Sequence, residues 1–291
     1  VLGPGFITAN VDNDSGGIFT YSLAGARYGY ALLWTLIPVT FVLIVVQEMS
    51  ARLGAVTGKG LADLIREEFG FRITFFMMAA LTVTNLANVM GEFAGVASSM
   101  QIFHVSKYIS VPVAAALVWL LVVKGTYKTV EKVFLFVCTI YITYLFSGVL
   151  AKPDWSAAAM SIVRPTVRLE SGYLMMFVGI IGATVAPWMQ FYLQSAIVEK
   201  GVEQKQYRQS RVEVIVGCVA ALVVAFFITI SCAATLHVAG RLDIADAADA
   251  ALALRPLAGE WASILFAIGL LNASVFAASI LRAVWSADSS M

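Results

Sequence analysis

The feature that most constrains this chain is a polar, glycine-ended break inside an apolar segment that runs from Leu2 to about Leu23. The break reads Asp12-Asn13-Asp14-Ser15-Gly16-Gly17. A charged group at mid-bilayer depth is costly unless it has a role there, and each glycine weakens a helix by roughly 1 kcal/mol. We therefore expect two half-helices joined by an unwound hinge, with backbone carbonyls exposed beside Asp14.

A second break interrupts the apolar segment from Tyr173 to Val198 at Ala183-Thr184-Val185-Ala186-Pro187. Pro187 has no N–H, so the carbonyl of Ala183 loses its helical partner. Taken alone, Pro187 is equally well explained as an ordinary kink. Two interrupted spans in corresponding halves of a chain are instead typical of an inverted-repeat transporter with its ion site at the membrane midplane.

Composition places the chain among polytopic, all-α membrane proteins. Hydrophobic residues make up 60% of it and charged residues only 13%, far from the composition of soluble domains. No basic patch with interleaved aromatic residues indicates a nucleic-acid partner. At about twenty residues per crossing, eight spans are predicted: 3–26, 30–51, 72–101, 107–123, 130–151, 172–199, 209–238 and 259–286.

The loops that follow the second, fourth and sixth spans carry more Lys and Arg than the opposite loops do. By the positive-inside rule, the N-terminus is predicted to be cytoplasmic. The sequence begins at Val1 and has no leader segment with a cleavage site, so we expect an N-terminal tail to be missing. A short surface helix is predicted from Leu61 to Phe69.

Four stretches of the sequence carry a recognisable pattern: GPGFITANVDNDSGG at 3–17, AGARYGYALLW at 24–34, QEMSARLGAVTGKGLADLI at 47–65 and GIIGATVAP at 179–187. They resemble the NRAMP family of divalent-metal transporters. The resemblance implies a LeuT-like fold in a single membrane domain, with residues 1–151 as a first inverted repeat of five spans. Residues 172–291 would then be a partial second repeat holding spans six to eight.

The chain departs from the family at both breaks. The family has Asp-Pro-Gly-Asn at the first hinge; here Asp14 matches the aspartate, and Gly17 replaces the coordinating asparagine. At the second hinge Ala183 keeps the carbonyl donor, Ala186 replaces a methionine and Trp188 replaces a histidine. Without the thioether, the site loses its preference for softer ions such as Mn²⁺ and Fe²⁺.

A pocket with one certain carboxylate suits Mg²⁺, which keeps several of its waters in protein sites. The predicted metal-binding positions are Asp14, Gly17, Val11, Ala183 and Ala186, through the Asp14 carboxylate and through backbone groups. Outer-shell waters could be held by Gln190, Gln194, Asn88 and Glu92. For the two glutamines, hydrogen bonding between helices is an equally good explanation.

The third span carries a further departure. The family's Thr-Asp-Leu-Ala-Glu-Val-Leu-Gly becomes Thr84-Asn85-Leu86-Ala87-Asn88-Val89-Met90-Gly91, and amides cannot titrate. With Trp188 at the histidine position, the resemblance implies that the proton path is lost at Asn85, Asn88 and Trp188. Glu92, next along the chain, either pairs with a polar neighbour or lines the cavity.

These substitutions are similar to those of the NRAMP-related magnesium transporters, a bacterial branch. That similarity implies an inner-membrane carrier of Mg²⁺, and of Mn²⁺ as well, that works by alternating access without proton coupling. It implies neither a cofactor nor an obligate protein partner; the partners are the divalent ion and the lipid bilayer.

Three other functions compete with this one. The nearest is a proton-coupled Mn²⁺/Fe²⁺ transporter with rearranged ligands, for which only Met189 offers a soft ligand near the second hinge. Another is an intramembrane aspartyl hydrolase, suggested by Asp14-Ser15-Gly16, but no second Asp-Ser/Thr-Gly supplies the required partner carboxylate. The last is a LeuT-fold transporter of organic substrates such as amines.

Overall fold

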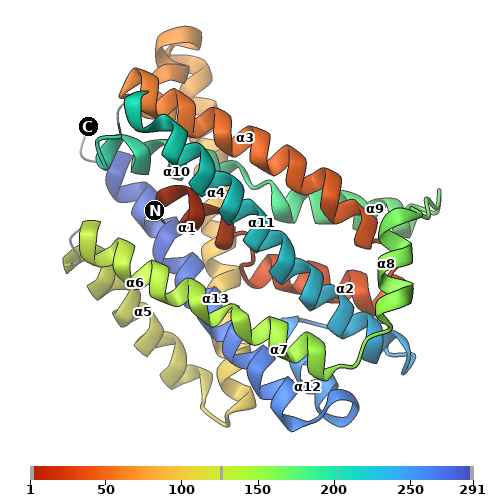
Figure 1. The fold of residues 1–291 in the computed structure, drawn as a ribbon. Helices are drawn as coiled ribbons and strands as arrows, with labels where there is room; N and C mark the ends of the chain where they lie inside the picture. Colours follow the sequence, from red (N-terminus) through yellow and green to blue (C-terminus); the bar gives the residue numbers. More distant parts are fainter. Residues whose placement is uncertain (1–2, 125–126, 203, 289–291) are drawn as a thin grey trace.

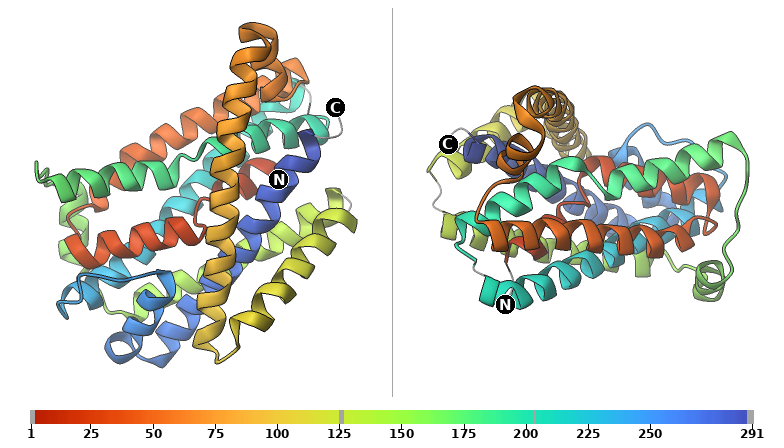
Figure 2. Two further views of the ribbon diagram at one scale, coloured as in Figure 1. Left: turned by 180° about the vertical axis from the view of Figure 1, so that it is seen from behind. Right: turned by 90° about the horizontal axis from the view of Figure 1, so that it is seen from above.

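The protein is represented by a computed structural model that describes residues 3–124, 127–202 and 204–288. Every regular element in these ranges is a helix. The helices pack into a bundle whose centre holds two short half-helices, and one very long helix crosses its outer face (Figures 1 and 2).

The first predicted span is two helices. Helix α1 (Pro4–Asn10) and helix α2 (Ser15–Tyr28) are separated by a four-residue hinge, Val11-Asp12-Asn13-Asp14. Pro4 starts α1, where its missing N–H costs nothing. The expected break in the first span is therefore confirmed, but Ser15, Gly16 and Gly17, which were expected in the break, form the first turn of α2. After a short 3₁₀ turn, η1 (Leu33–Thr35), the second span is α3 (Leu36–Thr57), which ends at Gly58 in the left-handed conformation.

Helix α4 (Leu61–Ile102) is 42 residues long, about twice what a bilayer requires. Gly70 interrupts it with φ 79° and ψ 170°, a conformation that glycine adopts readily. The segment before Gly70 is the surface helix predicted from Leu61 to Phe69, and the segment after it is the third span. In Figure 2 the surface helix hooks away from the end of the long span.

The fifth predicted span, 130–151, is not one straight helix. It divides at Tyr141, and the apolar helix that ends at Leu150 is bent by 110° from the next one. The elements of this region are α5 (Lys107–Lys124), α6 (Tyr127–Ile140), α7 (Ile142–Leu150) and α8 (Trp155–Val163).

The sixth span is also broken, as predicted. Two residues, Val185 and Ala186, separate the end of helix α9 (Ser171–Thr184) from the start of α10 (Pro187–Glu199). The remaining elements are the 3₁₀ turn η2 (Gln204–Gln206), α11 (Tyr207–Cys232), a π-helical turn η3 (Ala233–His237), α12 (Ala247–Ala258) and α13 (Glu260–Asp288).

In the described part of the chain, five helices or helix pairs are long and apolar enough to cross a membrane by themselves, or six if the bent pair counts as one span. The two further spans predicted from the sequence correspond to the broken α1–α2 pair and to α5, whose apolar part is short.

Helix α11 packs directly against the backbone of α1. A Cβ placed on Gly217 of α11 would lie 2.7 Å from the Cα of Phe6 and 2.9 Å from the carbonyl oxygen of Gly5. A Cβ on Gly5 would in turn lie 2.9 Å from the backbone nitrogen of Val214. Glycine on both sides thus allows the first half-helix to lie against α11, which fixes the position of the hinge.

We predict that Gly217→Ala lowers the free energy of unfolding by about 1–3 kcal/mol, because the added methyl group forces α1 and α11 apart. The measurement is the thermal midpoint of the purified protein in detergent. Gly182→Ala is the matched control, since nothing lies within 4 Å of a Cβ at Gly182. Equal midpoints for the two variants would contradict this account of the helix contact.

Candidate functional site

The first hinge ends at Asp14, which is the N-cap of α2. Its Oδ1 accepts a hydrogen bond from the backbone N–H of Gly17 at 2.7 Å. The first N–H groups of a helix have no intrahelical partner, and an aspartate at this position satisfies one of them. The helix dipole also favours negative charge here. The carboxylate is held by one oxygen, and its second oxygen remains able to meet a cation.

A second carboxylate reaches the same helix start from α4. Glu92 is 2% exposed, and its Oε2 accepts a hydrogen bond from the backbone N–H of Ser15 at 3.3 Å. The hydroxyl of Ser15 donates to the carbonyl of Gly91 at 3.3 Å. Two acidic side chains, Asp14 and Glu92, therefore bind N–H groups in one helical turn of α2.

Glu92 faces inward because of its place on α4. The buried residues of the membrane part of α4 recur every three, four or seven positions, which puts them on one face of the helix. Three of them are polar, so a polar stripe of α4 faces the bundle rather than lipid. These residues are Leu81, Asn85, Glu92, Val96 and Ser99.

The second hinge lies between Thr184 and Pro187. Pro187, four residues after Ala183, has no N–H to give to the Ala183 carbonyl. The carbonyl of Ala186 accepts a hydrogen bond from the N–H of Met189 at 3.2 Å, as expected for the residue that caps α10. Ala183 thus offers the freer carbonyl oxygen of the two.

A direct hydrogen bond joins α2 to the end of α9, beside the second hinge. The phenol of Tyr21, on α2, lies 2.8 Å from the hydroxyl of Thr184, the last residue of α9. Further along the same pair, the rings of Tyr28 and Tyr173 meet edge to face with centroids 5.4 Å apart. Helices α2 and α9 are therefore in contact at two places along their length.

The two acidic residues of the first hinge, Asp14 and Asp12, differ in their exposure to solvent. Asp14 is partly exposed and Gly16 beside it is exposed, whereas Asp12 is only 3% exposed. At the second hinge, Ala183 and Ala186 are also partly exposed. Asp14 and the second hinge can thus be reached by an ion, while Asp12 is enclosed.

Two further predicted ligand positions, Gly17 and Val11, have backbone N–H groups that are bonded within the protein, and their roles as ligands stay a prediction. Gly17 lies in the first turn of α2, where its N–H donates to Asp14 and so holds the carboxylate in place. A Cβ on Gly17 would lie 2.5 Å from the carbonyl oxygen of Asp12. Val11 caps α1 and is fully buried, with its N–H bonded to Ile7.

The amide nitrogens of the two predicted outer-shell glutamines donate to backbone carbonyls. With its amide oriented to suit its neighbours, Gln190 donates to the carbonyls of Ala186 and Pro187 at 2.7 and 2.6 Å, at the start of its own helix. Gln194 donates to the carbonyl of Lys59 at 2.9 Å, in the loop before α4. Its amide oxygen is buried and has no hydrogen-bond partner among the described residues, so a role for Gln194 in holding an outer-shell water stays a prediction.

The three positions predicted to have lost a proton path lie on the elements around the hinges. Asn85 is 2% exposed on α4, and Asn88 is partly exposed one turn further on. Trp188 is 1% exposed in the first turn of α10. Their roles in transport stay a prediction.

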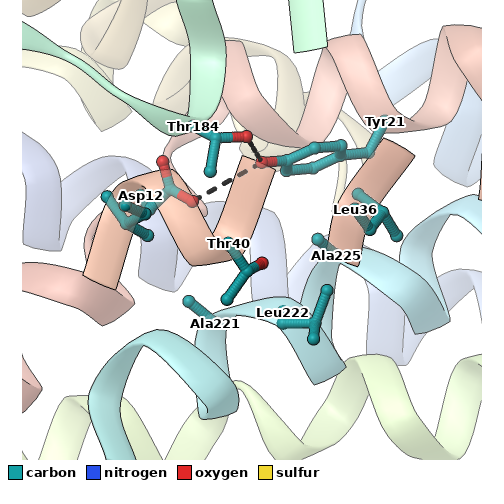
Figure 3. Close-up of a pocket in the computed structure, with 9 residues that line it drawn as sticks. Asp12, Tyr21, Leu36, Thr40, Thr184, Ala221, Leu222 and Ala225 are labelled. Atoms are coloured by element: carbon teal, nitrogen blue, oxygen red, sulfur yellow. Dashed lines mark hydrogen bonds between the residues drawn. The ribbon is translucent and has the colours of Figure 1, made fainter. Parts of the chain in front are cut away.

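Asp12, Tyr21 and Thr184 form a polar group that the sequence pattern does not reveal (Figure 3). Asp12 lies in the same polar break as Asp14, and Thr184 lies in the second break, so both were visible as intramembrane polar residues. Nothing in their spacing showed that Tyr21 would lie between them. That contact depends on how α2 and α9 pack.

Comparison with models of known families identifies the family of this chain. The family model described as "Natural resistance-associated macrophage protein-like" matches residues 5–285. The chain belongs to the Nramp family. Among curated relatives, the divalent metal cation transporter MntH of Deinococcus radiodurans is 32% identical over 290 residues, which are 96% of this chain and 66% of the relative. The MntH of Pectobacterium carotovorum is 30% identical over 286 residues, covering 94% of this chain and 68% of that protein.

Solved structures confirm the LeuT-like fold that is expected for an Nramp chain. The Eremococcus coleocola manganese transporter in complex with an aromatic bis-isothiourea substituted compound superposes with a TM-score of 0.74 at 22% identity, over 97% of this chain and 65% of that one. A mutant of the same transporter gives a TM-score of 0.76 at 21% identity, over 98% and 64% of the two chains. The present chain thus spans about two thirds of the length of the relatives that it matches.

The two roles of Asp14, as helix cap and as charge, can be separated by substitution. Asparagine caps a helix about as well as aspartate, whereas alanine does not. We predict that Asp14→Ala lowers the free energy of unfolding by about 1 kcal/mol and that Asp14→Asn leaves it nearly unchanged. Thermal unfolding in detergent without divalent ions measures both, and an equal loss in the two variants would contradict the capping role.

Proposed function

We propose that the protein to which this chain belongs carries divalent cations across the membrane, with Mg²⁺ as its main substrate and Mn²⁺ also carried. The observation that supports this most is the pairing of Asp14 and Glu92 on the first turn of α2. Together they supply two negative charges beside a divalent ion. Mg²⁺ is typically bound by one or two carboxylates and retains several waters, so the remaining positions need no further side chains.

The second hinge supplies oxygen rather than sulfur. The carbonyl of Ala183 lacks a helical donor because of Pro187, and Ala186 has no side-chain ligand. A site of carboxylate and carbonyl oxygens favours Mg²⁺ and Mn²⁺ without selecting between them strongly. We therefore assign the inner ligands to Asp14 and the Ala183 carbonyl, with Glu92 acting directly or through a water.

Uptake does not require protons in this proposal. Asn85 and Asn88 carry amides that cannot bind or release a proton. A divalent ion gains about 4.6 kcal/mol per 100 mV of membrane potential, at about 2.3 kcal/mol for each charge. That driving force alone favours entry more than a thousandfold. Rocking of the half-helices around the hinges would expose the site to each side in turn.

Relatives of this chain are named as divalent metal cation transporters and a manganese transporter, which favours transport over the aspartyl hydrolase. The nearest competing function remains proton-coupled Mn²⁺ transport, and the Eremococcus protein is named a manganese transporter. Membership of the magnesium-transporting branch and a cytoplasmic N-terminus are part of the proposal.

The decisive experiment is uptake by proteoliposomes that contain the full-length protein. Mg²⁺ and Mn²⁺ are supplied separately at a controlled membrane potential while internal pH is recorded. We expect Mg²⁺ entry that follows the potential, leaves internal pH unchanged and falls at least tenfold in Asp14→Asn. Because this variant keeps the helix cap, its loss of uptake reports on the charge. Uptake of Mn²⁺ alone, with acidification, would contradict the proposal.

The contribution of Glu92 is tested by Glu92→Gln, whose amide oxygen can still accept the Ser15 N–H. We predict a rise of about tenfold or more in the Mg²⁺ concentration needed for half-maximal uptake, because one of two negative charges is lost. The matched control is Glu68→Gln, which removes an exposed carboxylate from the surface segment of α4. Unchanged uptake in Glu92→Gln would restrict Glu92 to a structural role at the start of α2.

A further inference from the structure

The break in the fifth span reaches the first hinge. Tyr141, the residue between α6 and α7, is 2% exposed, and its hydroxyl donates a hydrogen bond to the backbone carbonyl of Asn13 at 3.3 Å. Asn13 is fully buried and directly precedes Asp14 in the hinge. A side chain that lies 128 positions away in the sequence therefore contacts the backbone beside the proposed ion-binding carboxylate.

The carbonyl of Asn13 has lost the donor that a helix would give it. In a continuous helix it would accept the N–H of Gly17, four residues further on. Here that N–H is bonded to the Oδ1 of Asp14 at 2.7 Å. A carbonyl without a donor is costly inside a membrane. The hydroxyl of Tyr141 thus replaces the donor that Asp14 has taken.

Asn13 is also attached on a second side. Its Nδ2 donates to the carbonyl of Ala221, on α11, at 3.2 Å. The side chain of Asn13 is thereby joined to α11, and its carbonyl is joined to the fifth span. Together the two bonds fix the direction of the hinge at the residue before Asp14.

Tyr141 is held in place by α13. Its ring lies against that of Phe276, with centroids 6.4 Å apart. Further along α7, the hydroxyl of Ser147 donates to the carbonyl of Ala262, on α13, at 3.0 Å. The position of Tyr141 therefore follows that of α13.

Helix α13 also packs against α4, which carries Glu92. A Cβ placed on Gly95 of α4 would collide with the hydroxyl of Ser274 on α13, and it would lie 2.8 Å from the Cβ of Ser15 on α2. The three helices thus meet closely at Gly95. The same scaffold of α7, α13 and α4 supports Glu92 directly and contacts the residue before Asp14 through Tyr141.

We propose that Tyr141 is a positioning residue for the divalent site. By donating to the Asn13 carbonyl, its hydroxyl keeps the Gly17 N–H on Asp14 and so fixes the orientation of the Asp14 carboxylate. Without the hydroxyl, the Asn13 carbonyl takes the Gly17 N–H, and Asp14 loses its anchor. Because it assigns an ion to Asp14, this role rests on the proposed function; the exchange of donors between Asp14 and Asn13 does not.

The first test compares two tyrosines. Tyr141→Phe removes the hydroxyl and keeps the packed ring. Tyr144→Phe is the matched control, because Tyr144 is a buried tyrosine of α7 whose hydroxyl has no partner among the described residues. In proteoliposomes of the full-length protein at fixed membrane potential, Tyr141→Phe should raise the Mg²⁺ concentration for half-maximal uptake about fivefold, the effect of one hydrogen bond. The maximal rate should stay nearly unchanged, and Tyr144→Phe should match the unmodified protein. Mn²⁺ is measured in the same way.

The second test measures whether the hydroxyl acts through Asp14. Thermal midpoints of the purified full-length protein are recorded in detergent without divalent ions. Asp14→Ala removes the helix cap and should lower the midpoint of the unmodified protein. In a Tyr141→Phe background the Gly17 N–H is bonded to Asn13, so Asp14→Ala should lower the midpoint by less than about half as much. A Tyr144→Phe background should show the full loss.

The proposal is overturned if Asp14→Ala lowers the midpoint equally in the Tyr141→Phe and unmodified backgrounds, because the hydroxyl would then act independently of Asp14. Unchanged half-maximal concentrations for both ions in Tyr141→Phe would overturn it as well, even if the maximal rate fell. Failure of the proposed function would appear in the unmodified protein instead, as uptake of Mn²⁺ alone with acidification. The midpoint comparison contains no ion and decides the role of Tyr141 in that case too.

Discussion

The hydrogen bond from the Gly17 N–H to Asp14 is the contact on which the rest of the site depends. A helix that starts inside a bilayer leaves N–H groups that water cannot reach, and unsatisfied backbone groups are costly in hydrocarbon. Asp14 satisfies one of them at 2.7 Å, and Glu92 satisfies another through Ser15. The same two bonds that allow α2 to begin at mid-chain therefore place two carboxylates beside the hinge.

Close contacts between helices fix the positions of α1 and α2 on either side of the hinge. Gly217 lets α1 lie against the backbone of α11, and Gly25 allows a similarly close approach of α2 to the carbonyl of Thr229 on the same helix. Helix α11 thus supports the two halves of the first broken span. The second broken span joins this unit through the bond between Tyr21 and Thr184. Small residues at helix contacts are a general means of packing in membranes.

The hinge presents acidic groups in two directions. Asp14 is partly open and lies with Glu92 near α4, while Asp12 is enclosed by α3, α9 and α11. The hinge consists of turns rather than extended backbone, so side chains two residues apart can point to different sides of the chain.

The sequence by itself determined the existence of the elements and of both breaks. Apolar length predicts spans, and glycine, proline and aspartate inside such spans predict interruptions, because these residues act on the local backbone. Asp14 and the Ala183 carbonyl were identified for the same reason. Only the tertiary structure decided which long-range partners these groups have. The bond of Glu92 to Ser15, the bond of Gln194 to Lys59 and the bond of Tyr141 to Asn13 each join residues far apart in the chain. Their positions depend on helix packing, and the local sequence does not encode that packing.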